Sequence, residues 1–600
     1  MKHAMSKRVL AALISGLAFP SFAAGVADAD LLKKIEALSS ELEQLKKQVQ
    51  QNEEKAAART ADAVQIEELK SQIKKVEDKS IGKWLTVGGD YRFRVDSLRG
   101  QTKAFTDVNA TFANAQQKLQ ADFFNNPSTA AGSSSYFGAP AAGGMSTAGA
   151  LGALMGFSQA INAVKTHDQA VAFVSNPQNA GLIQGIGAFA VPVPSYKPDN
   201  ATLYTNRFGL DLNAKATQDV SVNARMVMYK VFGAQDEGAL TNGAAAPYFA
   251  DRVGVFDGTL GHIPSTSYLN VDRAYGTWSN IGDQDIWFSV GRRPSTNGYP
   301  SNLKQNTAGP GKGGTPSLLV DYAFDGMTLG WAPDIESLPG AYAKLCYGRG
   351  YESGFRSTPA NAISDTDMLG ISVVPIDTDK LRAWLQWNRG FNIFDAPTMR
   401  DTYFGNTVPK TNLGDIDWFG GGAMGKLKKV GSGDLNWFAD VATSITHPNQ
   451  NVSAQFGFQG LLTGAFFAPE AASSKTGWAF ATGLRYDLPS RTKIGLEYNH
   501  GSKNWITFAP AADDMWTTKV GTRGNVYETY LIQELDRRPI SSFFSKAFFR
   551  VGFQYYDFEY TGSNNWVGAP VKISDVRGQM MTMTPLEKAY NLYATFEVKF

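Results

Sequence analysis

The sequence predicts an all-β protein, a transmembrane antiparallel β-barrel of about 16 strands, preceded by an α-helical coiled-coil segment. Three observations predict this fold. The last stretch, from Ala589 to Phe600, alternates apolar and polar residues and ends in an aromatic residue. Similar stretches recur from Asn200 onward, and their connections alternate between short and long. After the N-terminus no apolar run is long enough for a membrane helix, so a membrane-embedded chain must cross as strands with one apolar and one polar face.

Composition supports amphipathic strands joined by polar, glycine-rich loops. The chain of 600 residues contains 12% aromatic and 19% charged residues and 60 glycines. A net charge of +2 argues against a nucleic-acid partner. Cys346 is the only cysteine, so no internal disulfide forms. The five histidines have no metal-ligand spacing, and no catalytic set is recognisable. We therefore expect a protein that is not an enzyme and has no cofactor and no metal site.

The N-terminus has the pattern of a secretory signal. Lys2, Lys7 and Arg8 precede the apolar residues 9–19, and small residues stand at the two positions that matter for cleavage before Ala24. We therefore expect residues 1–23 to be a signal peptide.

Residues 30–80 are predicted to form a periplasmic coiled coil. This segment lacks proline and glycine from about Asp30 to Lys79, and its apolar residues are spaced three and four apart. The register slips in the alanine-rich middle, as a stammer would cause. The alternative is a single amphipathic helix lying on another surface. An intermolecular coiled coil would make a homotrimer or hold the protein near peptidoglycan. The expected seam consists of Ile35, Leu38, Leu42, Leu45, Val49, Ile66, Leu69, Ile73 and Val76.

The predicted barrel spans residues 84–600, and its first strand begins after Trp84. Residues 97–198 show no sustained period of two and are rich in Ala, Gly and Ser. We interpret them as a long extracellular loop with short helices near 107–124 and 148–174. This loop either folds over or into the barrel mouth or is a flexible surface loop.

The later strands form hairpins whose connections differ in length on the two sides of the predicted membrane. Short turns are expected near 216–219, 282–285, 333–340, 377–380, 430–434, 488–491 and 538–542. Long connections are expected after Val231 and at 297–317, 352–367, 392–413, 447–475, 502–522 and 560–586. Short turns on one side and long loops on the other are typical of outer-membrane barrels.

Strand phase predicts which charged side chains point into the barrel. The candidate pore-lining residues are Arg92, Arg94, Arg207, Asp211, Arg225, Arg382, Arg485, Lys493, Glu497 and Arg550. Arginines that face a pore would attract anions. The alternative is a mixed lining in which acidic residues balance the basic ones, as is ordinary in a wide wet barrel.

The final strand resembles that of outer-membrane β-barrel proteins of Gram-negative bacteria, which typically ends in Phe and is read by the barrel assembly machinery. This resemblance implies an assembly signal at Tyr590, Phe596, Val598 and Phe600, outer-membrane lipid as a partner, and location in the cell outer membrane. The stretches 290–298, 495–502 and 560–563 resemble a poorly characterised group of porins from delta- and epsilon-type proteobacteria. That resemblance implies a pore but names no substrate.

We therefore expect an outer-membrane porin, a passive diffusion channel for small polar solutes or ions. Two alternatives stay open. In one, the barrel is an anchor for an adhesive or envelope-tethering protein. In the other, it sheathes a partner such as a cytochrome, although this chain has no haem motif of its own.

Overall fold

The computed structural model describes residues 84–125, 147–233, 267–294, 322–355, 363–397, 405–509, 514–535 and 546–600, with shorter pieces at 40, 43–48, 264, 303–306, 318–320 and 399–402. No helix within these ranges is long and apolar enough to cross a membrane. The predicted signal peptide lies outside the described residues. So do the expected coiled-coil residues, except Leu45, which lies in a short helical piece at 43–48.

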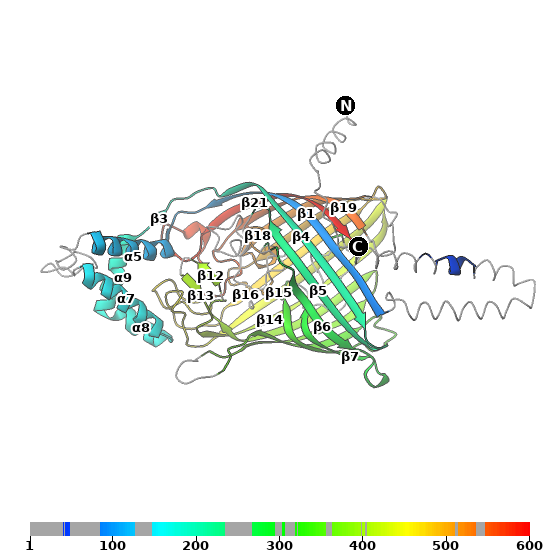
Figure 1. Ribbon diagram of the computed structural model, residues 1–600, viewed down its shortest axis with the longest axis horizontal. Coiled ribbons are helices and arrows are strands. Elements are labelled where there is room, and N and C mark those ends of the chain that lie inside the picture. The colour runs from blue at the N-terminus through cyan, green and yellow to red at the C-terminus, as the bar shows by residue number, and fades with distance from the viewer. Residues whose placement is uncertain are drawn as a thin grey trace, which may run out of the picture. The chain divides into compact units, whose positions relative to one another are not determined.

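Sixteen strands of the described chain close into one antiparallel barrel, which confirms the predicted fold class (Figure 1). Apart from the last strand, which pairs with the first, each follows its sequence neighbour around the sheet. The strands are β1 (Leu85–Thr102), β4 (Asp199–Lys215), β5 (Val220–Val231), β6 (Asn270–Trp278), β7 (Ile286–Pro294), β8 (Ala323–Trp331), β9 (Tyr342–Tyr351), β10 (Thr366–Asp377), β11 (Leu381–Phe394), β14 (Asn412–Val430), β15 (Gly433–Pro448), β16 (Thr476–Asp487), β17 (Thr492–Gly501), β18 (Gly524–Glu534), β19 (Lys546–Phe558) and β21 (Leu586–Lys599).

The barrel closes where its first strand meets its last, as any closed barrel requires. Phe93 of β1 lies opposite Phe596 of β21. The chain end extends this pairing, because the Phe600 amide donates to the Gly89 carbonyl at 3.0 Å and the Gly89 amide donates to the Phe600 carbonyl at 2.8 Å. A side chain at Gly89 would meet the Gly209 carbonyl oxygen and the Phe600 ring, so only glycine fits this close approach. Closure leaves the barrel without a free edge.

A row of tyrosines crosses the outward face of β17, β18, β19 and β21. Tyr498, Tyr527, Tyr555 and Tyr590 follow one another with ring centroids 5.2, 6.2 and 5.1 Å apart. Large apolar side chains such as Leu496 and Leu592 are exposed on the same face. An apolar outer band bordered by aromatic residues is the pattern of a barrel that meets lipid.

The opposite side of the barrel has a matching border at the end that carries the long connections. The Tyr347 hydroxyl donates to Asp367 at 2.8 Å, and the Trp387 indole N–H donates to Asp417 at 3.1 Å. Each aromatic side chain thus turns its polar group toward charges beyond the apolar band. The tyrosine row and these two aromatic side chains therefore mark the boundary between apolar and polar surroundings near the same end of the barrel, the end with the long connections.

The predicted asymmetry of the connections is observed. Short turns join β4 to β5, β6 to β7, β8 to β9, β10 to β11, β14 to β15 and β16 to β17 at one end. The turn expected near 538–542 lies outside the described residues. The connections at the other end are long and carry two small sheets, one of β12 (Met399–Thr402) and β13 (Gly405–Thr407), and one of β2 (Phe105–Asp107), β3 (Pro192–Val193) and β20 (Met580–Met581).

The first long connection begins later than expected, because β1 continues past Ser97 to Thr102. The alternation of inward and outward residues persists through Leu98 and Gly100, whose small or apolar side chains hid it in the sequence. The connection contains α5 (Val108–Asn125), α7 (Thr147–Ala163), α8 (His167–Ser175) and α9 (Pro177–Ile186). A capping box at Thr166 starts α8, and Asn176 followed by a proline starts α9.

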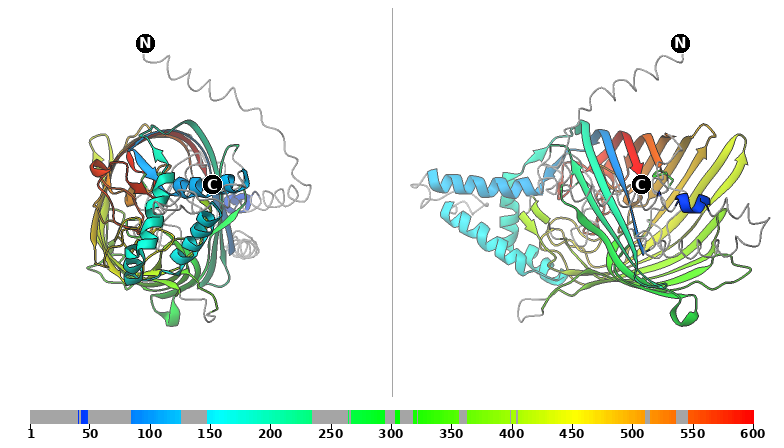
Figure 2. Two further views of the ribbon diagram at one scale, coloured as in Figure 1. Left: turned by 90° about the vertical axis from the view of Figure 1, so that its left-hand side faces the viewer. Right: turned by 45° about the vertical axis from the view of Figure 1, so that its right-hand side comes forward.

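These helices lie beyond the long-connection end of the barrel and not inside it (Figures 1 and 2). They pack on the connection between β15 and β16. Phe157 and Phe173 of the helices form a buried cluster with Phe458 of that connection. Backbone hydrogen bonds join the same parts, including one from the Val452 amide to the Lys165 carbonyl at 2.9 Å. The helices and the β15–β16 connection therefore form one small core of their own.

Other connections fold back into the barrel. Trp418 on β14 donates from its indole N–H to the Ile506 carbonyl at 2.8 Å. Trp566 donates to the Phe394 carbonyl at 2.6 Å, and Trp505 donates to the Val520 carbonyl at 2.7 Å. These side chains belong to a buried apolar cluster that includes Leu303, residues 318–320 and residues 461–462. The barrel interior thus contains a packed core built from several returning segments.

Candidate functional site: the barrel interior

The inward faces of two groups of strands differ in how much solvent they meet. We call the inward faces of β16–β19, β21 and β1 the filled wall, and those of β4–β8 the open wall. On the filled wall, the side chains of Arg94, Arg485 and Arg550 are 0%, 4% and 1% exposed. On the open wall, those of Asp211 and Arg273 are 50% and 28% exposed. The open wall therefore presents Asp211 and Arg273 to the lumen, while these arginines of the filled wall are covered.

Segment 514–523 covers the filled wall through a lysine. The Lys519 ammonium lies 2.8 Å from Glu528 and also bonds Glu497. Burial alone would lower the pKa of Lys519, but these carboxylates raise it well above its usual value. Lys519 is therefore charged, and it holds the segment against β17 and β18.

A second lysine enters from segment 303–306. The Lys304 ammonium lies 2.7 Å from Glu528 and 3.7 Å from Asp514. The Tyr593 hydroxyl donates to the same Glu528 carboxylate at 2.7 Å. Burial raises the pKa of Asp514, while Lys304 and Lys519 oppose that rise. Glu528 is thus the centre of a buried network that joins two strands and two returning segments.

Arg523 ties two returning connections together. Its guanidinium donates to the carbonyls of Trp505 at 3.0 Å, Gly562 at 2.7 Å and Asn565 at 2.5 Å. Its backbone amide donates to the Ser563 hydroxyl at 3.0 Å. The planar guanidinium supplies several donors in fixed directions, which suits a cluster of carbonyls that a lysine could not serve.

Several of the expected pore-lining residues lie on the filled wall and are covered. Arg94 pairs with Asp96 at 2.6 Å, and Arg550 pairs with Glu597 at 2.5 Å. Arg92 lies over the Tyr229 ring at 5.2 Å. These side chains do point inward as strand phase predicts, but they meet protein where an open lumen was expected.

Arg485, Lys493 and Glu497 show the same arrangement. Arg485 pairs with Asp487 at 2.7 Å and donates to the Leu303 carbonyl at 2.6 Å. Lys493 lies 2.8 Å from Glu534 and 2.6 Å from the Asn306 side chain. Glu497 accepts from Lys519. Segment 303–306 thus covers the short-turn end of the filled wall.

The open wall carries the expected residues Arg207, Asp211 and Arg225, and its charges are mixed. Arg207 lies 3.1 Å from Asp90. Arg225 bonds the same Asp90 and also Asp211, the latter at 2.6 Å. Arg382, further round the sheet on β11, bonds the Tyr342 hydroxyl and is 3.8 Å from Asp377. The open wall is therefore a lining in which carboxylates accompany the arginines.

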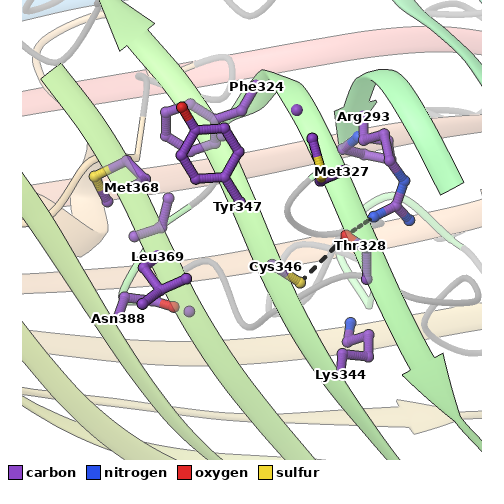
Figure 3. A pocket seen from close by; sticks show the side chains of 15 residues that line it. Arg293, Phe324, Met327, Thr328, Lys344, Cys346, Tyr347, Met368, Leu369 and Asn388 are labelled. Atoms are coloured by element: carbon purple, nitrogen blue, oxygen red, sulfur yellow. Dashed lines mark hydrogen bonds between the residues drawn. The ribbon is translucent and has the colours of Figure 1, made fainter. Parts of the chain in front are cut away.

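A cavity of about 60 Å³ lies in the wall at β7–β11 and is lined mostly by inward residues, with Met327, Tyr347 and Leu369 from the outward face (Figure 3). Arg293 donates to the Thr328 hydroxyl, which in turn donates to Cys346 Sγ at 3.4 Å. Lys344 lines the same cavity, and Asn388 stands at its far side. Within the described chain, no group of three or more His, Cys, Asp or Glu side chains could hold a metal ion.

Sequence reasoning missed the residues that fill the barrel. Lys304, Asp514 and Lys519 all lie in long connections, where no period shows which side chains turn inward. Arg293 could have been found, because it follows Arg292 in a strand and two neighbouring residues of a strand point to opposite faces. Arg292 pairs outward with Asp325, which leaves Arg293 on the inward face.

The residues of the expected assembly signal lie on the outward face of β21 and at the chain end. Tyr590 is exposed, and the Phe596 ring lies 5.1 Å from the Phe549 ring of β19. Val598 lies opposite Tyr91 of β1, and Phe600 closes the pairing with Gly89. Their role in assembly remains a prediction.

The fold is similar to that of solved porins at low identity. An anion-selective porin from Comamonas acidovorans matches with 11% identity and a TM-score of 0.35, covering 86% of this chain and 99% of that one. The outer membrane channel DcaP of Acinetobacter baumannii matches with 8% identity and a TM-score of 0.34, covering 86% and 97%. OmpT, an outer membrane protein of Vibrio cholerae, matches with 12% identity and a TM-score of 0.32, covering 67% and 93%.

None of the curated proteins matches this sequence. A family model does, and it covers every described barrel strand except β1, from just before β4 to the last residue. The chain belongs to the family described as "Protein of unknown function (DUF3373)", whose model matches residues 197–600.

Proposed function

We propose that the protein is an outer-membrane porin, a passive diffusion channel through which small polar solutes or ions pass along the open wall. The observation that carries this proposal is the exposure of charged inward side chains on β4–β6, within a closed barrel whose opposite wall is filled. Charged groups such as Asp211 and Arg273 are partly exposed, so a polar solute that moves past them would keep favourable partners.

The mixed charge of the open wall predicts weak selectivity along most of its length. Arg207 and Arg225 share Asp90, and Asp211 adds a second carboxylate beside Arg225. Their potentials largely cancel at the distance of a hydrated ion. We therefore expect both anions and cations to pass this stretch.

Electrical recording in planar bilayers tests the proposal. Purified, folded protein should produce stepwise ion conductance, and reversal potentials across a salt gradient should report its selectivity. Complete absence of conductance from protein that has folded and inserted would contradict a channel function.

A second candidate is an outer-membrane anchor, and the filled wall favours it. Connections that fill much of a barrel stabilise a rigid base, and the helices beyond the barrel end would then serve as a binding surface. A strain lacking the protein would lose envelope attachment or adhesion but keep its uptake of small solutes. Loss of uptake with intact attachment would instead support the channel.

We further propose that residues 30–80 form a periplasmic coiled coil that makes an oligomer, and the mass in detergent would show whether it is a trimer. The basis is the spacing of the apolar seam in the sequence. Replacing Leu42 and Leu45 by Asp should reduce the oligomer and leave the barrel inserted. An unchanged mass in detergent would mean that the segment has another role.

A further inference from the structure

Two cationic side chains line the cavity in the wall at β7–β11. Arg293 lies between the rings of Tyr275 and Trp287, 5.4 and 5.6 Å from their centroids, and donates to Thr328. Lys344 lies 5.8 Å from the Tyr342 ring centroid and is buried. Both point to the inward face, because their neighbours Arg292 and Leu345 point outward. The cavity thus collects positive charge inside the barrel wall.

The polar groups beside these cations, a serine hydroxyl and a glutamine amide, can donate hydrogen bonds. Ser372 lies opposite Lys344 in the sheet, and Gln386 lies opposite Ser372. Both side chains are buried, and neither the Ser372 hydroxyl nor the two polar atoms of the Gln386 amide has a hydrogen-bond partner within the described structure. Arg293 Nε also lacks one there. Buried donors without a partner are costly, and a bound acceptor would offset that cost.

The composition of the lining decides the sign of the ligand. Among the described residues that line the cavity, none carries a carboxylate. This distinguishes it from the rest of the interior, where Arg225, Arg485 and Arg550 each pair with Asp or Glu. Desolvated cations are stabilised by an anion, and the guanidinium fork of Arg293 matches the oxygens of a carboxylate or similar oxyanion.

The size of the cavity limits the ligand. Its volume is about 60 Å³, and one water molecule occupies roughly 30 Å³ of liquid. A side chain at Gly326 would meet the Tyr347 carbonyl oxygen, and one at Gly370 would meet the Asn388 side chain, so glycine lets the lining pack closely at both positions. A small anion fits such a space.

We propose that this cavity is a binding site for a small oxyanion, such as a short carboxylate or nitrate, held by Arg293 and Lys344. Ser372 and Gln386 lie next to the lining and are not part of it. The inference rests on the proposed channel function, since it names a class of permeating solute that would bind transiently to the barrel wall. The cavity would then be a part of the interior that prefers anions, within a lining whose positive and negative charges otherwise balance.

Cys346 provides a direct test, because it lines the cavity and is the only cysteine in the chain. The full-length protein, folded in detergent, would be treated with a negatively charged and with a positively charged methanethiosulfonate reagent. The negative reagent should react with Cys346 at least about tenfold faster, since a local positive potential raises encounter rates by such factors. Sodium nitrate or acetate should slow the reaction more than sodium gluconate at equal ionic strength.

Variants separate the site from general effects of charge. Arg293→Gln and Lys344→Gln should each reduce the preference for the negative reagent and the protection by nitrate. Lys344→Arg keeps the charge and should retain both. Lys380→Gln removes a lysine from an exposed short turn and should change neither. Equal rates for the two reagents, no reaction with either, or no protection by the small oxyanions would each overturn the proposal.

This outcome is independent of the channel function. Thiol reaction in detergent requires no ion to cross a membrane. A protein that conducts ions but reacts equally with both reagents would keep the proposed function and lose the oxyanion site. Charge-selective reaction and protection without bilayer conductance would keep the site and contradict the channel.

Discussion

The filled wall and the open wall carry the same pattern of alternating residues, yet only one of them meets solvent. Arg550 on β19 and Arg207 on β4 both point inward, as their strand phase requires. Arg550 also donates to the Lys304 carbonyl and is covered, whereas Arg207 remains partly exposed. Strand phase therefore determines the direction of a side chain, and the returning connections determine whether it reaches a solute.

The two walls also use charge differently. On the filled wall, Lys304 and Lys519 come from connections and pair with carboxylates of the strands. On the open wall, Arg207 and Arg225 pair with a strand residue, Asp90 of the neighbouring β1. Charges on the filled wall hold the returning segments 303–306 and 514–523, which we call the plug. Charges on the open wall face the lumen. Substitutions should therefore affect stability on the first wall and ion selectivity on the second.

The largest effect is expected from Lys519→Met. The change leaves Glu497 and Glu528 buried with one cation fewer, and losing one partner of a buried ion pair costs about 3–5 kcal/mol. Unfolding in urea, followed by tryptophan fluorescence, should show this loss, and release of segment 514–523 should raise the conductance. Lys380→Met in an exposed turn is the control. Equal stability of the two variants would contradict a plug held by charge.

A smaller effect is expected from Arg523→Lys. The variant keeps the positive charge but cannot serve the carbonyls of Trp505, Gly562 and Asn565 together. Hydrogen bonds from charged groups contribute on the order of 2 kcal/mol, so the midpoint of urea unfolding should fall. Arg577→Lys, at an exposed arginine, should leave it unchanged. An unaltered midpoint in Arg523→Lys would mean that packing alone holds the two connections.

The smallest effect on stability is expected from Asp211→Asn on the open wall. Its side chain is half exposed, so the pair with Arg225 contributes less than about 1 kcal/mol. Removing this carboxylate should shift the reversal potential toward anions. Asp379→Asn, in an exposed short turn, should not shift it. A large loss of stability together with an unchanged reversal potential would contradict the assignment of ion selectivity to the open wall.

Much of the fold follows from local pattern. Alternation in stretches such as β16 and β17 predicts both the strands and their inward faces, and the pairing of the chain end with the first strand follows from closure. The boundary at Ser97 is wrong, because β1 continues through residues whose polarity does not alternate clearly. Local pattern therefore locates strands well and their ends less well.

The interior was much less predictable. Lys304, Lys519 and Arg523 act through contacts with residues far away in the sequence, and no periodicity links a connection to the wall that it covers. The cavity near Lys344 depends on strands β7–β11 lying side by side, with glycines at inward positions. Such a site arises from the register of several strands and cannot be read from any one of them.

The accessibility of the two walls to a water-soluble reagent tests the central claim most directly. In a Cys346→Ser background, Asp211→Cys and Gln554→Cys place one thiol on the open wall and one on the filled wall. The reaction of each with a charged methanethiosulfonate reagent would be followed in folded protein and during bilayer recording. We predict that the thiol at position 211 reacts and alters the conductance, while the thiol at position 554 stays unreacted. Equal reaction at both positions, or reaction at 554 alone, would contradict the account.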